Sequence, residues 1–266
     1  MDLQAEYDNR ARVPGHPAII AGWQRDAAAW RDACPRAELA LAYGERGREK
    51  LDLFWPHATG DAVSIAMFIH GGYWQALGRE WVSHCARGLN ARGVAVAVPS
   101  YDLCPAVPLA TIVGQMQAAA AWLFQRHGRP VLAAGHSAGG HLAAMLLATD
   151  WPARGLPAGM VSGALAISGV FELEPLRATS IGTGLALDAG EALALSPRWM
   201  PRPAGPIHCV VGGAESGEFI RQSRDMAAAW AGDFATVPGA DHFTVLAPLS
   251  APASELVTRA EGLAAA

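Results

Sequence analysis

The chain has few cysteines, and none of them belongs to a metal-binding or redox motif. The 266 residues include four cysteines: Cys34, Cys85, Cys104 and Cys209. They form no C-x-x-C pair and show no zinc-like spacing with histidine. We therefore expect reduced, mostly buried thiols and no metal site.

Long apolar runs and clusters of positive charge are also missing. The apolar runs are far shorter than the roughly 20 residues that a membrane-spanning helix needs. The first ten residues are mostly polar and do not resemble a secretory signal. The formal net charge is -4 and no stripe of Lys or Arg is visible. We expect a cytoplasmic protein that binds neither nucleic acid nor a membrane.

The residues that are present indicate one α/β domain over residues 1–266. No repeat, low-complexity tail or flexible linker divides the chain, whose length suits a single large core. Strand-like and helix-like segments alternate, which predicts a mostly parallel twisted sheet with helices on both faces. The expected strands are 51–55, 63–69, 94–98, 131–134, 164–167, 207–211 and 234–237. The expected helices are 80–92, 109–127, 140–147, 219–230 and one at the C-terminal end.

Two segments stand apart from this alternation. Residues 1–45 precede the sheet and contain a helix-like stretch from Pro17 to Ala33. The stretch from Phe171 to Ser196 is the one loop long enough to act as a small lid. A large inserted cap domain is therefore not expected.

A serine occupies a sharp turn between a predicted strand and a predicted helix. The turn reads Gly135-His136-Ser137-Ala138-Gly139 and follows the apolar run 131–134. In such a G-x-S-x-G elbow, small neighbours permit a strained backbone that pushes the serine hydroxyl above the sheet. Because the chain contains 29 glycines, the pentapeptide needs support from other parts of the sequence.

One supporting segment lies upstream, at the end of the strand predicted over 63–69. It reads His70-Gly71-Gly72-Tyr73-Trp74, and its adjacent glycines let backbone N–H groups face a ligand. A loop at this position supplies half of an oxyanion hole. The other half is the backbone N–H of the residue that follows the serine. The expected oxyanion hole comprises Gly71, Gly72, Tyr73 and Ala138.

The general base has to be chosen among nine histidines. His136 and His141 belong to the serine turn itself, from which neither ring folds back easily to the hydroxyl, so we interpret both as structural. Five others are expected inside a strand, in loops or on polar faces: His16, His57, His84, His127 and His208. His242 follows the last predicted strand, where a loop can bring its imidazole over Ser137, and is the predicted base.

The acid should follow a late strand and precede His242 in the chain. Glu215, in the loop after the strand predicted over 207–211, is the predicted acid. Glu172, after the strand predicted over 164–167, is the alternative. Asp241 is adjacent to His242, and neighbouring side chains rarely point at each other. We expect Asp241 to stabilise its loop instead.

Five motifs spread over nearly the whole chain carry a resemblance to a known family. They are Tyr7-Asp8-Asn9-Arg10, His70-Gly71-Gly72-Tyr73-Trp74, Gly135-His136-Ser137-Ala138-Gly139-Gly140-His141, Glu215-Ser216-Gly217-Glu218-Phe219 and Asp241-His242-Phe243. Together they resemble the arylformamidase (kynurenine formamidase) and related carboxylesterase branch of the α/β-hydrolases. In that family the H-G-G-x-W motif supplies the oxyanion hole and the elbow serine is the nucleophile.

The chain departs from the family pattern at the acid. The resemblance implies an Asp in a D-S-P-E-F-like segment, where this chain carries Glu215 in place of the Asp and Gly217 in place of the Pro. Glutamate serves as the acid in other α/β-hydrolases. The resemblance also implies that the N-terminal segment lies over the active-site end of the sheet.

These residues predict a serine hydrolase that forms an acyl-enzyme and requires no metal or organic cofactor. The resemblance implies a small aryl formamide of the N-formylkynurenine type as substrate. A general carboxylesterase acting on small aryl or alkyl esters is the alternative. A non-catalytic ligand-binding protein on the same fold is a third reading, because fold alone does not determine function.

Aromatic residues near the motifs predict a flat aromatic substrate, although aromatic residues of an α/β core more often serve in packing. Five are predicted to contact the substrate: Tyr73, Trp74, Tyr101, Phe171 and Phe243. The expected partner is a small-molecule aromatic amide or ester. Self-association into a homodimer stays open.

Overall fold

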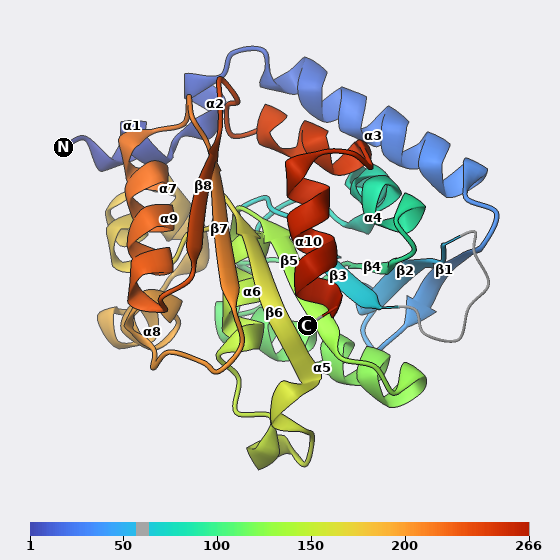
Figure 1. Ribbon diagram of the computed structural model, residues 1–266. Helices are drawn as coiled ribbons and strands as arrows, with labels where there is room; N and C mark the ends of the chain where they lie inside the picture. The colour runs from blue at the N-terminus through green and yellow to red at the C-terminus, as the bar shows by residue number, and fades with distance from the viewer. Residues whose placement is uncertain (57–63, 266) are drawn as a thin grey trace.

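The computed structural model describes residues 1–56 and 64–265, and within these ranges eight strands form one sheet (Figure 1). The strand order is β1-β2-β4-β3-β5-β6-β7-β8. The β1–β2 and β2–β4 pairs are antiparallel, and all other neighbours are parallel. The predicted mostly parallel sheet is confirmed.

Most strands are buried on both faces, because helices cover the two sides of the parallel part. In β5, Val131 and Ala133 belong to one hydrophobic cluster, and Leu132 and Ala134 belong to the cluster on the opposite face. The strands are β1 Ala37–Ala42, β2 Lys50–Phe54, β3 Ile65–Ile69, β4 Ala95–Pro99, β5 Val131–His136, β6 Val161–Ile167, β7 Ile207–Gly212 and β8 Asp233–Val237.

One strand differs from the sequence-based expectation, and the first residue of another cannot be compared with it. β1 was not expected, since its sequence Ala-Glu-Leu-Ala-Leu-Ala consists of good helix formers. Pairing with β2 gives this segment its extended conformation. Val63, the first residue of one predicted strand, lies outside the described residues.

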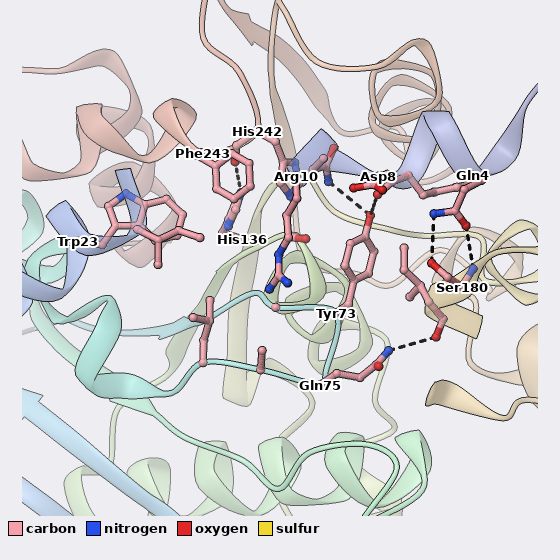
Figure 2. A pocket seen from close by; sticks show the side chains of 18 residues that line it. Gln4, Asp8, Arg10, Trp23, Tyr73, Gln75, His136, Ser180, His242 and Phe243 are labelled. Carbon is pink, nitrogen blue, oxygen red and sulfur yellow. Dashed lines mark hydrogen bonds between the residues drawn. The ribbon is translucent and has the colours of Figure 1, made fainter. Parts of the chain in front are cut away.

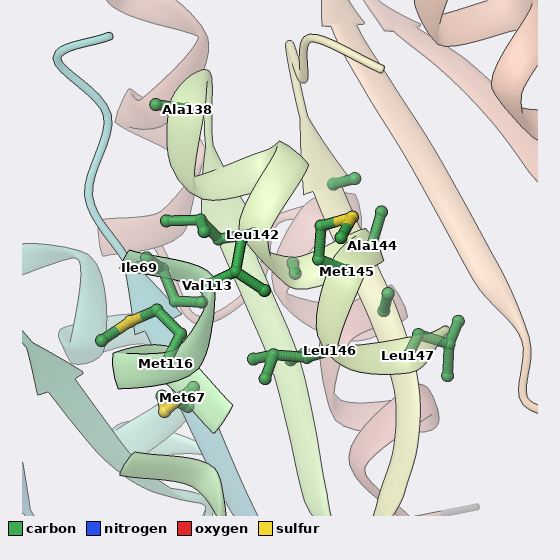
Figure 3. Packing of buried hydrophobic residues seen from close by; sticks show 14 of the residues in the cluster. Met67, Ile69, Val113, Met116, Ala138, Leu142, Ala144, Met145, Leu146 and Leu147 are labelled. Carbon is green, nitrogen blue, oxygen red and sulfur yellow. The ribbon is translucent and has the colours of Figure 1, made fainter. Parts of the chain in front are cut away.

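Helices pack on both faces of the sheet. One face carries α5 (Leu109–His127), α6 (Ala138–Leu147) and α9 (Gly217–Ala229). The other carries α3 (His16–Ala33), α4 (Arg87–Ala91) and α10 (Glu255–Ala265). Figure 3 shows Leu142 and Leu146 of α6 near Val113 and Met116 of α5, all within one hydrophobic cluster. The helix that carries Ser137 at its start is thereby held from several sides.

The helix predicted over 80–92 is broken into short pieces. These are η1 (Arg79–Trp81), η2 (Ser83–Ala86) and α4. The carbonyl of Arg79 accepts from the Ser83 hydroxyl at 2.8 Å, where a continuous α-helix would offer it to the N–H of Ser83. Local side-chain bonding thus competes with the regular helix.

Two further segments lie near the ends of the parallel strands. The N-terminal segment forms α1 (Leu3–Tyr7), α2 (Asn9–Arg12) and α3, which run along one edge of the molecule (Figure 1). The stretch predicted as a lid folds into η5 (Glu174–Ala178), α7 (Ser180–Leu185) and α8 (Ala189–Ala194), and η6 (Pro197–Trp199) follows it. Over residues 1–56 and 64–265, every helix is too short or too polar to cross a membrane.

Candidate active site

Ser137 occupies a strained turn between β5 and α6. Its φ is 56° and its ψ is -119°, a region that residues with a side chain rarely adopt. The N–H of Ser137 donates to the carbonyl of Ile167 at 2.8 Å, and the Ser137 carbonyl accepts from Gly140 and His141. These bonds hold the turn in place, and Ser137 lines a cavity.

Gly139, the last residue of the motif, has to be a glycine because two backbone segments approach each other closely there. A Cβ atom on Gly139 would lie 2.0 Å from the carbonyl oxygen of Ile69, at the end of β3. A larger residue would push α6 away from β3 and relax the turn that presents Ser137. This contact explains why the elbow needs a glycine at this position.

His242 is paired with Glu215 inside the protein. The Nδ1 atom of His242 lies 2.6 Å from Oε2 of Glu215, and because a carboxylate only accepts, Nδ1 is the donor. The other oxygen, Oε1, accepts from the N–H of Gly212 at 2.7 Å and from the hydroxyl of Ser168 at 2.5 Å. The carboxylate is therefore fixed in orientation, and Nε2 is the nitrogen of His242 that is left to accept a proton.

The structure separates the two candidate acids. Glu172 lies beside Arg221, whose guanidinium donates to it at 2.9 and 3.2 Å, and makes no recorded contact with His242 in the part of the chain that the structure describes. Glu215 is the carboxylate that meets His242. Asp241 accepts from the N–H groups of Phe243 and Thr244, both at 2.8 Å, and stabilises its turn as expected.

Ser168 is a site residue that the sequence analysis missed. It directly follows β6 and has a φ of 49°. Its hydroxyl reaches Glu215 because β6 and β7 are parallel neighbours whose carboxyl ends meet at one edge. The sequence feature that could have indicated Ser168 is its position as a small polar residue at the end of a buried strand.

The histidines of the serine turn have structural roles, as expected. The Nε2 atom of His136 donates a hydrogen bond to the carbonyl oxygen of His242 at 2.8 Å. His141 makes a similar bond of 2.7 Å to the carbonyl oxygen of Leu195. His57 lies outside the described residues.

The loop after β3 adopts three consecutive left-handed conformations. The φ angles are 98° for Gly72, 51° for Tyr73 and 57° for Trp74. Gln75 donates to the carbonyl of Gly72 at 2.9 Å, and Cys104 donates to that of Trp74 at 2.8 Å. The carbonyl groups of Gly72 and Trp74 are thus engaged within the fold.

This loop lies directly against the serine turn. A Cβ atom on Gly71 would lie 3.0 Å from the Cβ atom of Ser137. Within residues 1–56 and 64–265, no acceptor is recorded for the N–H groups of Gly72, Tyr73 and Ala138. Free donors beside a nucleophile are what an oxyanion hole requires, so these three N–H groups stay the predicted donors.

A cavity of about 500 Å³ lies over Ser137 and His242 (Figure 2). Its walls come from the N-terminal segment, the loop after β3, the serine turn, α7 and the loop that carries His242. The lining residues are Gln4, Tyr7, Asp8, Asn9, Arg10, Ile20, Trp23, Gly72, Tyr73, Gln75, Ala76, Leu77, His136, Ser137, Ser180, Ile181, His242 and Phe243.

Three of the five aromatic residues predicted to contact the substrate do not line this cavity. Trp74, Tyr101 and Phe171 are fully buried in the core. The ring of Trp74 meets the ring of His141 edge-on at 5.0 Å, and that of Tyr101 stacks on the ring of His70 at 4.1 Å. Those predictions were wrong, because proximity to a motif in sequence does not decide the direction in which a side chain points.

Tyr73 and Phe243 do line the cavity, together with Trp23, which the sequence analysis did not single out. The Trp23 ring of α3 lies 6.2 Å from the ring of His136 and 6.0 Å from that of Phe243. The helix around Trp23 was expected, but its position over the site depends on packing between segments distant in sequence. The cavity therefore retains an aromatic wall.

Hydrogen bonds anchor the N-terminal segment to the site. The Tyr73 hydroxyl donates to the carbonyl of Tyr7 at 2.7 Å and accepts from the side chain of Asn9 at 3.3 Å. The Tyr7 hydroxyl donates to Glu218 of α9 at 2.8 Å. The segment is thus joined both to the loop after β3 and to the helix that follows Glu215.

The amino-acid sequence matches a known protein family and is similar to several known proteins. A family model described as the alpha/beta hydrolase fold matches residues 66–201. A kynurenine formamidase of Salmo salar is 32% identical over 225 residues, which cover 79% of this chain and 76% of that protein. A kynurenine formamidase of Danio rerio is 30% identical over 222 residues, covering 79% of this chain and 75% of that protein.

Solved structures agree with the fold. The crystal structure of a protein provisionally called a thioesterase, from Silicibacter sp., has a TM-score of 0.90 and 36% identity, covering 97% of this chain and 98% of that one. An esterase of Pyrobaculum calidifontis has a TM-score of 0.73 at 18% identity, covering 94% of this chain and 93% of that one. At that identity the second likeness concerns the fold alone.

The Glu215–His242 pair predicts unequal effects of two matched substitutions. Glu215→Gln should lower kcat/KM for a chromogenic aryl ester by about 10³-fold or more, because the imidazole loses the carboxylate that orients it and stabilises its charge. Glu172→Gln should change it only a few-fold. Circular dichroism would show that both variants are folded. Wild-type turnover in Glu215→Gln, with Glu172→Gln inactive, would move the acid to the other strand.

Buried histidines predict that stability is lost in mild acid. Burial lowers the pKa of His70 to about 3 and that of His141 to about 4, and it also lowers the pKa of His136. In the unfolded chain these groups titrate near 6.5. Their stabilising contribution is therefore present above pH 6.5 and falls below it, by up to about 1.4 kcal/mol per pH unit for each histidine.

Urea unfolding at pH 7.5, 6.0 and 5.0 measures this loss. In His141→Gln the free energy of unfolding should fall less steeply with pH than in the wild type, although the variant starts from lower stability. A free energy of unfolding that does not change between pH 7.5 and 5.0 would contradict the prediction.

Proposed function

The chain belongs to the α/β-hydrolase family, in the branch that includes the kynurenine formamidases, and on that premise we propose that this hydrolase cleaves small aryl formamides through Ser137. The observation that carries the proposal is a strained serine that shares one cavity with a histidine, which a buried carboxylate orients. The names of the relatives support a formamide as substrate.

In the proposed reaction, His242 accepts the hydroxyl proton of Ser137 at Nε2 while the serine oxygen attacks the formyl carbon. Glu215 keeps the Nδ1–H of His242 in place and stabilises the imidazolium that forms. The N–H groups of Gly72, Tyr73 and Ala138 stabilise the negative charge on the carbonyl oxygen.

Collapse of this intermediate breaks the carbon–nitrogen bond. His242 returns the proton to the departing arylamine, which leaves a formyl ester on Ser137. A water molecule then attacks that ester with the same proton transfers, and formate is released. An aryl nitrogen is a better leaving group than an alkyl amine, so proton donation from one histidine suffices.

The shape of the cavity supports an aromatic leaving group. About 500 Å³ is large for a formyl group alone, and Trp23, Tyr73 and Phe243 contribute aromatic surface to its walls. Such surfaces bind flat rings well. Small aryl esters are expected to be cleaved too, because they share the carbonyl geometry and have a better leaving group.

A comparison of substrates tests the proposed function. The wild type should cleave N-formylkynurenine and phenyl acetate, and Ser137→Ala should lose both activities together by about 10³-fold or more. Specificity constants for these two substrates and for longer-chain esters provide the measurement. Efficient ester cleavage with no formamide cleavage would leave carboxylesterase as the function.

We also propose that the enzyme works in the cytoplasm. Cys34, Cys85, Cys104 and Cys209 are buried free thiols, the state that a reducing compartment preserves. Cell fractionation followed by immunodetection would test the location, and enrichment outside the cytoplasmic fraction would contradict it.

A further inference from the structure

The cavity over Ser137 carries two opposite charges that no step of the proposed reaction uses. Apart from histidines, Asp8 and Arg10 are the charged side chains among the described residues that line it (Figure 2). Both come from the N-terminal segment and lie two residues apart. A site that only cleaved neutral esters would have no need of either charge.

The guanidinium of Arg10 is free to bind a ligand. Arg10 is exposed, and within residues 1–56 and 64–265 its side chain has no recorded ion pair or hydrogen bond. The neighbouring Arg12, by contrast, pairs with Glu6 at 3.6 Å. Arg12 therefore has an acidic partner, whereas Arg10, within the described residues, lies unpaired on the cavity wall.

Asp8 retains one free carboxylate oxygen. Its Oδ1 atom accepts from the N–H of Ala11 at 2.9 Å at the start of α2, and no partner of Oδ2 is recorded in the described part of the chain. Asp8 and Arg10 are not paired with each other there either, since no contact within 4.0 Å is recorded between them. Each charge can therefore take a ligand group of opposite sign.

The backbone that carries the two residues is well anchored. Asn9 lies between them, is buried, and donates to the Tyr73 hydroxyl at 3.3 Å. Gln4, one turn earlier, exchanges two hydrogen bonds with Ser180, at 3.1 and 2.8 Å. The backbone at Asp8 and Arg10 is thus fixed at a defined place relative to the loop after β3, so ligand binding does not have to order this segment of the chain.

We propose that Asp8 and Arg10 form a subsite for the zwitterionic α-amino acid end of the substrate. The guanidinium of Arg10 binds the α-carboxylate through paired N–H donors, and the free oxygen of Asp8 accepts from the α-ammonium group. The formamide at the other end of the same molecule then lies near Ser137. The proposal rests on the proposed function, because it assigns the two residues that bind the amino acid end of such an aryl formamide.

Calorimetric binding of a product-like pair of compounds tests the subsite without needing turnover. L-kynurenine carries the amino acid group, and 2-aminoacetophenone has the same aromatic ring without it. Arg10→Gln should raise the Kd of L-kynurenine relative to that of 2-aminoacetophenone by about tenfold or more, as expected for loss of a charge-assisted contact. Asp8→Asn should shift the same ratio in the same direction, and Arg10→Lys should restore part of it.

Arg12→Gln is the matched control, because Arg12 neighbours Arg10 but does not line the cavity. It should leave the Kd ratio unchanged. An unchanged ratio in both Arg10→Gln and Asp8→Asn, or failure of the wild type to bind L-kynurenine, would overturn the subsite.

Kinetics separate this inference from the proposed function. If the wild type cleaves formamides but the Kd ratio does not respond to Arg10→Gln, the function stands and the subsite is wrong. If the ratio responds but formamides are not cleaved, the subsite stands and the proposed reaction is wrong.

Discussion

The site depends first on the strained turn that joins β5 to α6. Ser137 adopts a positive φ, which is unfavourable for a residue with a side chain, and the cost has to be offset by the surrounding structure. The α6 helix is buried along its whole length, and Gly139 lets it approach the carbonyl of Ile69. The apolar core of α5, α6 and β3 in Figure 3 therefore holds the turn that places Ser137 on the cavity wall.

Parallel strands then bring the other groups to the same edge. Ser137 follows β5, Ser168 follows β6, Glu215 follows β7 and His242 follows β8. The carboxyl ends of β5, β6, β7 and β8 are successive neighbours in the sheet, so residues more than 100 positions apart in sequence meet there. Ser168 and the N–H of Gly212 hold one oxygen of Glu215, which leaves the other for His242.

The N-terminal segment completes the cavity, although it belongs to none of the parallel strands. Tyr7 and Asn9 bind the Tyr73 hydroxyl, and Asp8 and Arg10 lie on the cavity wall beside them. One short segment thus both supports the loop next to the serine and contributes the only carboxylate and guanidinium found among the described lining residues. The segment that supports the loop next to the serine is therefore also the one that carries the proposed subsite.

The sequence by itself determined the architecture and the motifs, because strand and helix patterns and the G-x-S-x-G turn are local properties. The strand and helix alternation, the position of Ser137 at a strand-to-helix turn and the structural roles of His136 and His141 could all be predicted. The catalytic roles assigned to Ser137, Glu215 and His242 stay predictions, for which the geometry gives support.

Only the tertiary structure brought Glu215, and not Glu172, into contact with His242, since both follow late strands and their distances to His242 depend on how the strands are ordered. It also decided that Trp74, Tyr101 and Phe171 are core residues while Trp23 faces the cavity. The direction of a side chain and its distant neighbours are set by packing between segments far apart in the chain, and no local pattern contains that information.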